Sequence, residues 1–514
     1  MDSHAENTRR IAKNTLMLYV RMLFGMLVSL YTSRVVLNTL GVEDYGIYNV
    51  VGGVVAMFSL ISNSLSSSVS RFLTFELGRG DMQRLKDIFS TSVLIHLALA
   101  MIVLVLAETV GVWFLNIHMT IPAERLHAAN WVFQASVVSF MFGLFSVPYN
   151  ASIVAHEHLS IFAYFSILDI TLRLAIVIFI AYASFSADKL IIYSLLLLAA
   201  SIFSRQIYWF YCRRNFEECR VSRTFNKNYW KQMSSFAGWN FIGCTAGLLK
   251  DQGVNIILNI YMGPVINAAR GIAMSVNSAV NSFVGNFMTA LNPQITKSYA
   301  SEDRDYMFSL VERGARFSFY ILLMLTLPIL FETEFILTLW LKQYPEHTVN
   351  FVRLVLILSM CDTLSNTLVT LQNATGRIRN YQIAVGGILM LNLPLSCLCL
   401  ELGYPPEATL LVAIVVSICC MALRLLFLRQ MTGMSIAIFI KNVCIRAVMV
   451  SLCSVVIPLF LTRTIACNGW EHFAIMTIVC VICSLISICI IGCTKSERRF
   501  VLQKIVALRS KTDR

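Results

Sequence analysis

Several ionisable side chains stand inside long apolar stretches of this 514-residue chain. Burying such a group among apolar residues costs several kcal/mol, so it usually pairs with an opposite charge or faces a polar cavity. These residues are therefore the first candidates for chemistry. They are Arg21, Arg34, Asp169, Arg173, Lys250, Asp251, Arg270, Arg353 and Asp362.

Lys250 and Asp251 lie near the centre of one apolar stretch, and Asp362 lies in the middle of another. Neighbouring residues of a helix project about 100° apart, so we expect Lys250 and Asp251 to meet different partners. Lys250 suits a position that lines a polar lumen. Asp362 fits either a carboxylate that responds to protons or sodium ions, or the partner of a base.

The remaining charges have simpler readings available. Asp169 and Arg173 are four residues apart and can pair on one helix, either as a structural ion pair or as a pair lining a cavity. Arg34 and Arg353 stand near the ends of their apolar stretches, where a long side chain can extend to the headgroups of a bilayer.

A polar stripe accompanies these charges. On a helical wheel, six mostly polar residues of the stretch 266–292 fall on one face. They are Arg270, Asn277, Asn281, Gly285, Thr289 and Asn292. The stripe predicts either hydrogen bonds between helices or the wall of a polar cavity, and the Arg favours the cavity. A similar small and polar face, which includes Asn63, runs along 49–70.

Other chemistry has little support. The acidic pair Asp303 and Asp305 is better explained as a solvated charge cluster than as a metal site. Neither the His residues nor Cys397 and Cys399 show the spacing of metal ligands, and no phosphate-binding Gly-rich loop with Lys occurs. We predict no catalytic residue, no metal and no cofactor.

The elements that position these residues are apolar and of membrane-spanning length. Hydrophobic residues form 57% of the chain and charged residues 13%, which suits a bilayer rather than water. We predict an all-α polytopic membrane protein of about 14 transmembrane helices. They cover 13–37, 44–67, 88–112, 129–154, 160–184, 188–210, 234–262, 266–292, 317–341, 350–372, 380–401, 405–428, 443–463 and 470–494.

The positive charges set the orientation. Most of the 41 Lys and Arg residues lie in the N-terminus, the C-terminus and every second loop, which predicts that both termini are cytoplasmic. The net charge of +13 therefore faces anionic headgroups, and we expect membrane lipids rather than nucleic acid as its partner. We read the basic N-terminus as uncleaved.

A weak internal similarity predicts two six-helix lobes related as a parallel pseudo-repeat, with two extra C-terminal helices. The predicted domains are 1–210 for the N-terminal lobe, 211–233 for a cytoplasmic linker, 234–428 for the C-terminal lobe, 429–494 for two additional helices and 495–514 for a basic cytoplasmic tail.

Four runs in the chain carry a family resemblance. They are Gly238-Trp239-Asn240, the run from Leu249 to Gly253, the run from Gly263 to Ala273 with its Asn267-Ala268-Ala269-Arg270-Gly271 core, and Asn292-Pro293-Gln294-Ile295. With the opening that ends Leu40-Gly41-Val42-Glu43-Asp44-Tyr45-Gly46, they resemble lipopolysaccharide and O-antigen export proteins. These are Wzx-like flippases of the multidrug/oligosaccharidyl-lipid/polysaccharide (MATE-like) superfamily.

The resemblance implies alternating access and a cationic lumen. It implies that the chain carries an undecaprenyl-pyrophosphate-linked oligosaccharide from the inner to the outer leaflet of the bacterial cytoplasmic membrane, beside polysaccharide polymerase or ligase machinery. Lys250 and Arg270 are the bases expected to meet phosphate. The acids Asp251 and Asp362 are unexpected beside an anionic cargo, which leaves coupling to H⁺ or Na⁺, or internal pairing, open.

Two other functions are weighed. A multidrug exporter working by cation antiport on the same fold should have an acidic, aromatic cavity, whereas the bases stand foremost here. A membrane enzyme such as a polysaccharide polymerase or ligase typically carries a long outer loop, and the outer loops predicted here are short.

Overall fold

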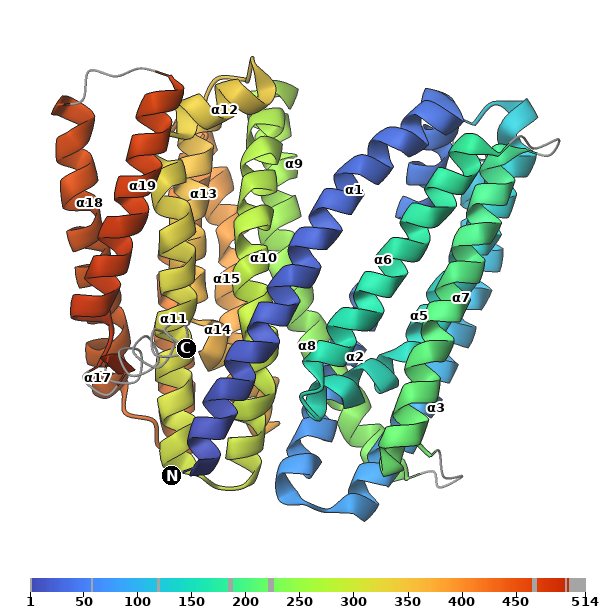
Figure 1. Cartoon of the computed structure of the whole chain (residues 1–514), viewed down its shortest axis with the longest axis horizontal. Coiled ribbons are helices and arrows are strands. Elements are labelled where there is room, and N and C mark those ends of the chain that lie inside the picture. The colour runs from blue at the N-terminus through green and yellow to red at the C-terminus, as the bar shows by residue number, and fades with distance from the viewer. Residues whose placement is uncertain are drawn as a thin grey trace, which may run out of the picture. The chain divides into compact units, whose positions relative to one another are not determined.

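The computed structural model of this protein describes residues 2–56, 59–117, 121–183, 188–220, 226–464, 469–494 and 497–498. The side chains of Arg34 and Asn63, two of the residues considered from the sequence, are not among those that the structure describes. Within the described ranges the chain is helical and has no strand, which confirms the predicted all-α class (Figure 1).

The chain divides into two compact units. Unit 1 is formed by Met1–Cys244 together with Thr289–Asp303, and unit 2 by Thr245–Met288 together with Arg304–Arg514. Two helices, α8 (Lys227–Leu248) and α10 (Pro264–Ala300), run through a unit boundary. The lobe boundaries expected from the sequence remain a prediction.

Unit 1 begins with the long helix α1 and continues to α8. Its elements are α1 (Asp2–Ala56), α2 (Ser59–Arg79), α3 (Met82–Leu106), the π-helix η1 (Ala107–Gly111), α4 (Val112–Ile117), η2 (Ala123–Arg125), α5 (Leu126–Ala155), α6 (Leu159–Tyr182), α7 (Lys189–Asn215) and η3 (Glu217–Cys219).

Unit 2 begins within α8 and contains the greater part of α10. Its further elements are the π-helix η4 (Leu249–Gly253), α9 (Val254–Met262), α11 (Arg304–Phe331), α12 (Thr333–Leu341), α13 (Thr348–Thr363), α14 (Asn366–Thr375), α15 (Arg379–Glu401), α16 (Ala408–Thr432), α17 (Ile436–Phe439), the π-helix η5 (Ile440–Ile445), α18 (Arg446–Thr464), α19 (Trp470–Ser487) and the π-helix η6 (Ile488–Gly492).

Glycines permit two local features of unit 1. Gly41 has φ 84° and ψ 169° inside α1, so α1 is two helices joined at a sharp break. A residue with a Cβ would be strained in this left-handed conformation, whereas glycine is not. Gly78 lets α2 approach the end of α10 closely, because a Cβ there would lie 2.8 Å from the Lys297 carbonyl oxygen.

Eleven helices among the described residues are long and apolar enough to cross a membrane. They match eleven of the predicted spans. The other three are 44–67, which includes residues outside the description, and 234–262 and 266–292. The last two cover η4, α9 and parts of α8 and α10, where charged and polar residues such as Lys250, Asp251 and Arg270 interrupt the apolar run. The count of 14 therefore remains a prediction, and the stretches that miss the criterion include the one with the clearest candidate site residues.

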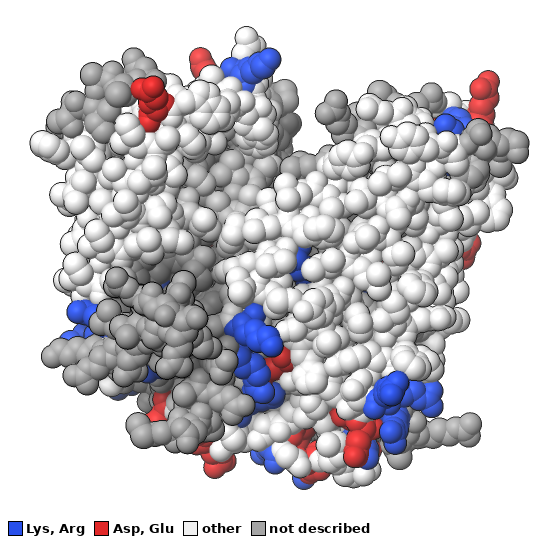
Figure 2. Space-filling model, viewed as in Figure 1, with Lys and Arg blue, Asp and Glu red and all other residues white. Residues whose placement is uncertain are grey.

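The surface has the character of a protein immersed in lipid. Large apolar side chains are exposed along α18 and α19, among them Leu452, Phe460 and Ile478. Figure 2 shows charged side chains gathered mostly near the helix ends, with a broad uncharged band between them. Internal contacts of unit 1 include an apolar cluster around Phe133, Val132 and Leu190. These features agree with a multi-pass membrane protein.

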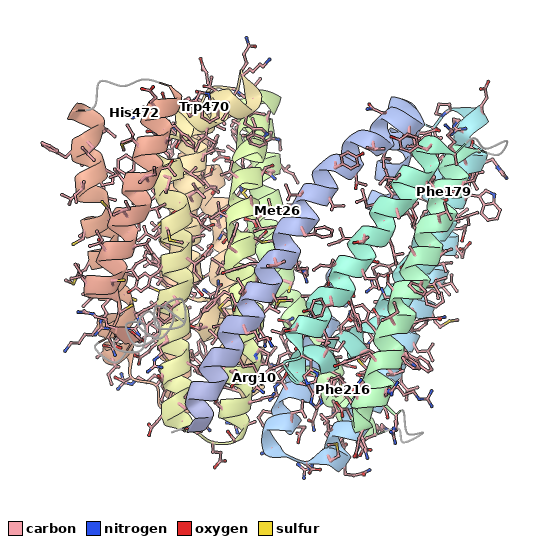
Figure 3. All side chains as sticks on the ribbon, in the orientation of Figure 1. Arg10, Met26, Phe179, Phe216, Trp470 and His472 are labelled. Carbon is pink, nitrogen blue, oxygen red and sulfur yellow. The ribbon has the colours of Figure 1, made fainter. Side chains whose placement is uncertain are left out.

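Aromatic residues collect at the start of α19. Trp470, labelled in Figure 3, lies 5.5 Å from Phe335 between ring centroids, and Phe473 stacks on the same ring at 5.1 Å. His472, the residue before Phe473, contacts Glu332 with Nε2 and Oε1 3.1 Å apart. Rings with a polar neighbour at a helix end are typical of a membrane–water interface.

Candidate functional site

Unit 2 contains a polar cavity of about 90 Å³ where η4, α9, α10, α13, α15 and α16 meet. Its lining includes five of the residues predicted from the sequence. They are Lys250, Asp251, Arg270, Asn277 and Asp362. Residues from stretches more than 100 positions apart thus meet at one site, which we call the unit-2 polar cavity.

Lys250 and Asp251 stand on the π-helical turn η4, and both border the cavity. The contacts found there involve the Lys250 side chain and the Asp251 backbone. The Lys250 ammonium lies 3.6 Å from Asp362 Oδ2, and the backbone carbonyl of Asp251 accepts a hydrogen bond from Arg270 Nη2 at 3.4 Å. The 3.6 Å distance is longer than that of a close charged hydrogen bond, so the ammonium is loosely held.

Arg270 is the most deeply buried base of the site. Only 4% of the residue is exposed, and its Nε and Nη1 atoms have no hydrogen-bond partner among the described residues. A buried donor without a partner costs about 1–3 kcal/mol, more when it carries charge. A guanidinium in this situation is ready to receive the oxygens of an anion, which it binds through two parallel N–H groups.

The Asn residues of the stripe hold the cavity wall in place. Ser359 Oγ on α13 donates to Asn277 Oδ1 at 2.5 Å, while Asn281 Nδ2 donates to the same oxygen at 2.8 Å. The sequence predicts that the stripe either forms hydrogen bonds between helices or lines a polar cavity. Asn277 and Asn281 make hydrogen bonds from α10 to Ser359 of α13, and Asn277 also lines the cavity.

Two acids balance the two bases of the cavity. Asp362 accepts a short hydrogen bond from Ser417 on α16 and faces Lys250, and Asp251 stands beside Arg270. The cavity is small, about 90 Å³, and charged and polar side chains form much of its lining. The cavity as it stands can therefore receive a small ion or a single charged group.

The other predicted site residues lie outside this cavity. Asp169 and Arg173 are in unit 1 on α6, with Asp169 Oδ2 3.0 Å from Arg173 Nε, and Ser204 of α7 donates to Asp169 at 2.8 Å. Their contacts are those of an ion pair supported by a hydrogen bond from a neighbouring helix. A role in transport stays a prediction. The side chain of Asn63 lies outside the described residues.

Sequence reasoning missed an ionic cluster around Glu157 in unit 1. The Glu157 carboxylate, 1% exposed, lies 2.6 Å from Lys297 Nζ and 2.8 Å from Arg10 Nη2, and it accepts a short bond from Gln294. Asn14 donates to the Glu157 carbonyl at 3.1 Å. The cluster ties the start of α1 and the end of α10 to the loop between α5 and α6. A lone Glu in a loop gives no periodic signal by which to find it.

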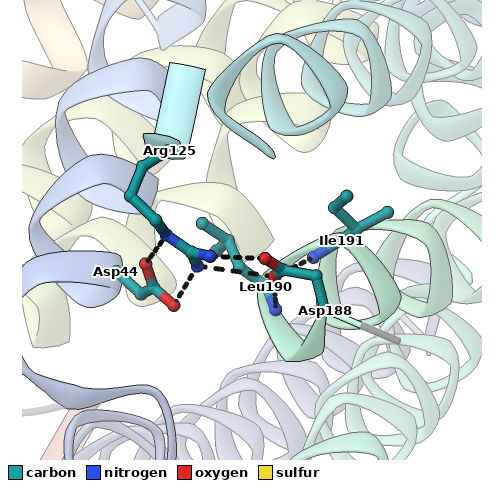
Figure 4. A network of polar contacts seen from close by, with 5 residues as sticks. All are labelled: Asp44, Arg125, Asp188, Leu190 and Ile191. Carbon is teal, nitrogen blue, oxygen red and sulfur yellow. Dashed lines mark hydrogen bonds and ion pairs between the residues drawn. The ribbon is translucent and has the colours of Figure 1, made fainter. Parts of the chain in front are cut away.

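A second cluster of unit 1 surrounds Arg125, one of the few bases in a predicted outer loop. Its guanidinium bridges Asp44 on α1 and Asp188, the residue before α7 (Figure 4). Asp188 also accepts hydrogen bonds from the Leu190 and Ile191 amides at 2.8 and 3.4 Å. Burial alone would raise the pKa of Asp188, but the Arg125 and amide hydrogen bonds prevail and lower it.

Comparisons with known proteins agree with this architecture. The family model described as "Polysaccharide biosynthesis protein" matches residues 11–299. The chain is 22% identical over 307 residues to "Uncharacterized membrane protein EpsK" of Bacillus subtilis (strain 168), covering 57% of this chain and 58% of that protein. The match thus spans little more than half of this relative.

Solved structures show the same fold. A MATE in the bent conformation superposes with a TM-score of 0.72 at 11% identity, covering 83% of this chain and 96% of that one. A transporter of the MOP superfamily from Pyrococcus furiosus Vc1 (DSM3638), described as having a binding pocket of reverse polarity, gives 0.69 at 11% identity, over 82% of this chain and 95% of that one. At such identity the likeness concerns the fold alone. Because the family model covers more than half of its length, the chain belongs to the polysaccharide biosynthesis protein family, within a MATE-like fold.

Proposed function

We propose that this protein is a flippase, not an enzyme, that carries an undecaprenyl-pyrophosphate-linked oligosaccharide from the inner to the outer leaflet of the bacterial cytoplasmic membrane by alternating access. Family membership supports the link to polysaccharide biosynthesis. The observation that supports anion recognition most directly is Arg270, a buried guanidinium with two nitrogen atoms free of partners among the described residues.

In this proposal the unit-2 polar cavity binds the phosphate part of the cargo, because the cavity is small and its lining contains the two bases Lys250 and Arg270. Arg270 receives phosphate oxygens directly, and Lys250 exchanges Asp362 for the cargo. The glycan is then accommodated elsewhere along the path. Cytoplasmic termini, the lobes 1–210 and 234–428, and association with a polymerase or ligase belong to the same proposal.

The test uses the purified protein in proteoliposomes with a fluorescent undecaprenyl-pyrophosphate-linked oligosaccharide. Arg270→Ala and Lys250→Ala should each reduce the rate of flipping at least tenfold, because each removes a charge that meets phosphate. Arg429→Ala, an exposed base in the last turn of α16, is the matched control and should flip at the wild-type rate. Wild-type rates in both cavity variants would refute the proposed phosphate site.

The role of Asp362 separates internal pairing from ion coupling. If Asp362 only neutralises Lys250, Asp362→Asn should keep flipping, and it should bind the pyrophosphate cargo more tightly because Lys250 is released. If Asp362 binds the coupling H⁺ or Na⁺, the same variant should lose flipping driven by an ion gradient. Measuring rates with and without each gradient distinguishes the two.

A MATE-type antiporter of cationic drugs is the alternative. The acids Asp251 and Asp362 would suit a cation, whereas a buried Arg270 would repel one. In a deletion strain, glycan lipids that accumulate on the inner leaflet support the flippase. Normal glycan lipids with new sensitivity to cationic drugs would support the antiporter.

A further inference from the structure

Unit 2 also contains a larger cavity, of about 550 Å³, between α11 and the segment that joins α16 to α18. No residue that lines this cavity also lines the unit-2 polar cavity. Its lining consists of Asp305, Phe308, Ser309, Glu312, Arg313, Arg316, Gly433, Met434, Ser435, Ile438, Asn442, Arg446 and Thr494. We call it the α11–α18 cavity. Its volume falls in the range of ligand sites.

Two guanidinium groups in this cavity have spare donors. Arg316 is 3% exposed, and its Nη2 donates to Glu497 Oε1 at 2.8 Å, while its Nε has no partner among the described residues. Arg446 Nη1 is likewise buried and without a partner in the described part of the chain. Buried charged donors of this kind favour an anion with several oxygens, such as a phosphate group.

Two acids lie on the same face of α11, nearer its start. Glu312 precedes Arg316 by one helical turn, about 6 Å along the axis, and Asp305 precedes Glu312 by two turns. Glu312 Oε2 accepts a hydrogen bond from Asn442 Nδ2 at 2.9 Å. The lining thus contains three bases and two acids, and Glu497 contacts two of those bases. This balance disfavours a purely anionic ligand.

The charges are ordered along the predicted path into the bilayer. On α11 the acids Asp305 and Glu312 lie nearer the predicted cytoplasmic end than Arg316 does. The lining also contains the apolar side chains of Phe308, Met434 and Ile438, and Ile438 is 51% exposed. A phospholipid with an ammonium group has the same order of charges, with the ammonium outside the phosphate.

We propose that the α11–α18 cavity binds a zwitterionic phospholipid of the inner leaflet whose headgroup carries a primary ammonium. Arg316 and Arg446 receive the phosphate, and Asp305 and Glu312 receive the ammonium. Basic pockets between transmembrane helices on the cytoplasmic side are known to hold lipid headgroups. The site is distinct from the proposed phosphate site, because none of its residues borders the unit-2 polar cavity.

The test counts retained lipid on the delipidated full-length protein by native mass spectrometry. Phosphatidylethanolamine, phosphatidylcholine and phosphatidylglycerol with identical acyl chains are added in equal amounts. We expect phosphatidylethanolamine to be retained at least threefold more than either of the others, because phosphatidylglycerol has no cation for the acids and the choline group has no N–H donor. Greater or equal retention of phosphatidylglycerol overturns the proposal.

Variants locate the lipid. Arg446→Gln should lower retention of phosphatidylethanolamine at least threefold, whereas Glu312→Gln and the exposed Asp305→Asn should remove its advantage over phosphatidylglycerol. Arg429→Gln, exposed and outside the lining, should match the wild type. Unchanged retention in Arg446→Gln places the lipid elsewhere. Displacement of the lipid by millimolar inorganic phosphate identifies a free-phosphate site and overturns the lipid assignment.

Discussion

At the scale of single residues, the Glu157 carboxylate of unit 1 combines complete burial with two cationic partners. Its backbone has φ 61°, a left-handed conformation that costs a non-glycine residue about 1–3 kcal/mol. Such a conformation persists when the surrounding contacts hold it firmly, as Lys297, Arg10, Gln294 and Asn14 do here.

Glu157→Gln should therefore destabilise the protein markedly. The amide removes the negative charge and leaves Lys297 without its counter-charge in a largely buried place. Breaking a buried ion pair costs about 3–5 kcal/mol, and we expect about 3 kcal/mol because Arg10 is half exposed. Unfolding of the purified protein in detergent measures the effect.

Glu217→Gln is the matched control for this change. Its carboxylate is 68% exposed and pairs with Lys86 at 3.2 Å, so its loss should change stability by less than about 0.5 kcal/mol. Equal stability of the two variants would mean that the Glu157 cluster does not hold α1 and α10 to the loop between α5 and α6.

The candidate site was partly predictable at this scale. Lys250, Asp251, Arg270 and Asp362 stand out because charge inside an apolar stretch is rare, and Asn277 stands out through helical periodicity. Which of them share a cavity depends on how six elements pack, and that information is not local in the sequence. Ser359 and Asn392 line the same cavity but give no signal, since a lone Ser or Asn in a helix is common.

At the scale of elements, Arg125 joins three of them at one end of unit 1. It belongs to η2 and bonds to Asp44 on the second segment of α1 and to Asp188, which caps α7 (Figure 4). The break at Gly41 brings a short stretch of α1 to this cluster, so a motif noted for its resemblance, Leu40 to Gly46, has a structural role here as well.

The lowered pKa of Asp188 gives this cluster a pH dependence. A carboxylate whose folded-state pKa lies below its unfolded value, about 3.9, stabilises the folded protein above that pH. The stabilisation is lost as the pH falls through the folded-state pKa. We expect the wild type to lose about 1 kcal/mol more than Asp188→Asn between pH 5 and pH 3.

Asparagine is the informative replacement because it caps helices about as well as aspartate. Asp188→Asn therefore removes the negative charge, while the Asn side-chain oxygen can still accept the hydrogen bonds from the Leu190 and Ile191 amides. Thermal unfolding from pH 7 to pH 3 is the measurement. Parallel curves for the two proteins would show that the charge of Asp188 contributes nothing to stability.

At the scale of the whole molecule, the membrane topology depends on the helices that carry the polar faces. Eleven described helices satisfy a criterion of length and hydropathy, whereas 14 spans are expected from the alternation of positive loops. In α10 the side chains Arg270, Asn277 and Asn281 lower the mean hydropathy, and a helix that faces a protein interior can still span the bilayer with such residues.

Parity makes this a sharp test. Fourteen spans place the two termini on the same side of the membrane, and eleven place them on opposite sides. We expect a green fluorescent protein fused to the C-terminus to be fluorescent, because it folds in the cytoplasm. We expect the same of a fusion truncated after Asn215, where Arg213 and Arg214 end α7. Alkaline phosphatase at these two positions should be inactive.

Active phosphatase at both positions would contradict 14 spans and favour eleven, because omission of 44–67 alone would place residue 215 outside and omission of all three polar stretches would place the C-terminus outside as well. A cytoplasmic C-terminus together with an external residue 215 would instead imply that a single further stretch fails to cross. Since α10 holds Arg270 in the unit-2 polar cavity, a topology in which α10 does not span would also remove Arg270 from any path across the membrane. Failure of 234–262 and 266–292 together would keep both reporters cytoplasmic, so a third fusion after Gly263, which lies between these two stretches, completes the test. The 14-span topology places this position outside, so alkaline phosphatase fused there should be active, and an inactive enzyme would contradict the membrane crossing on which the proposed flippase depends.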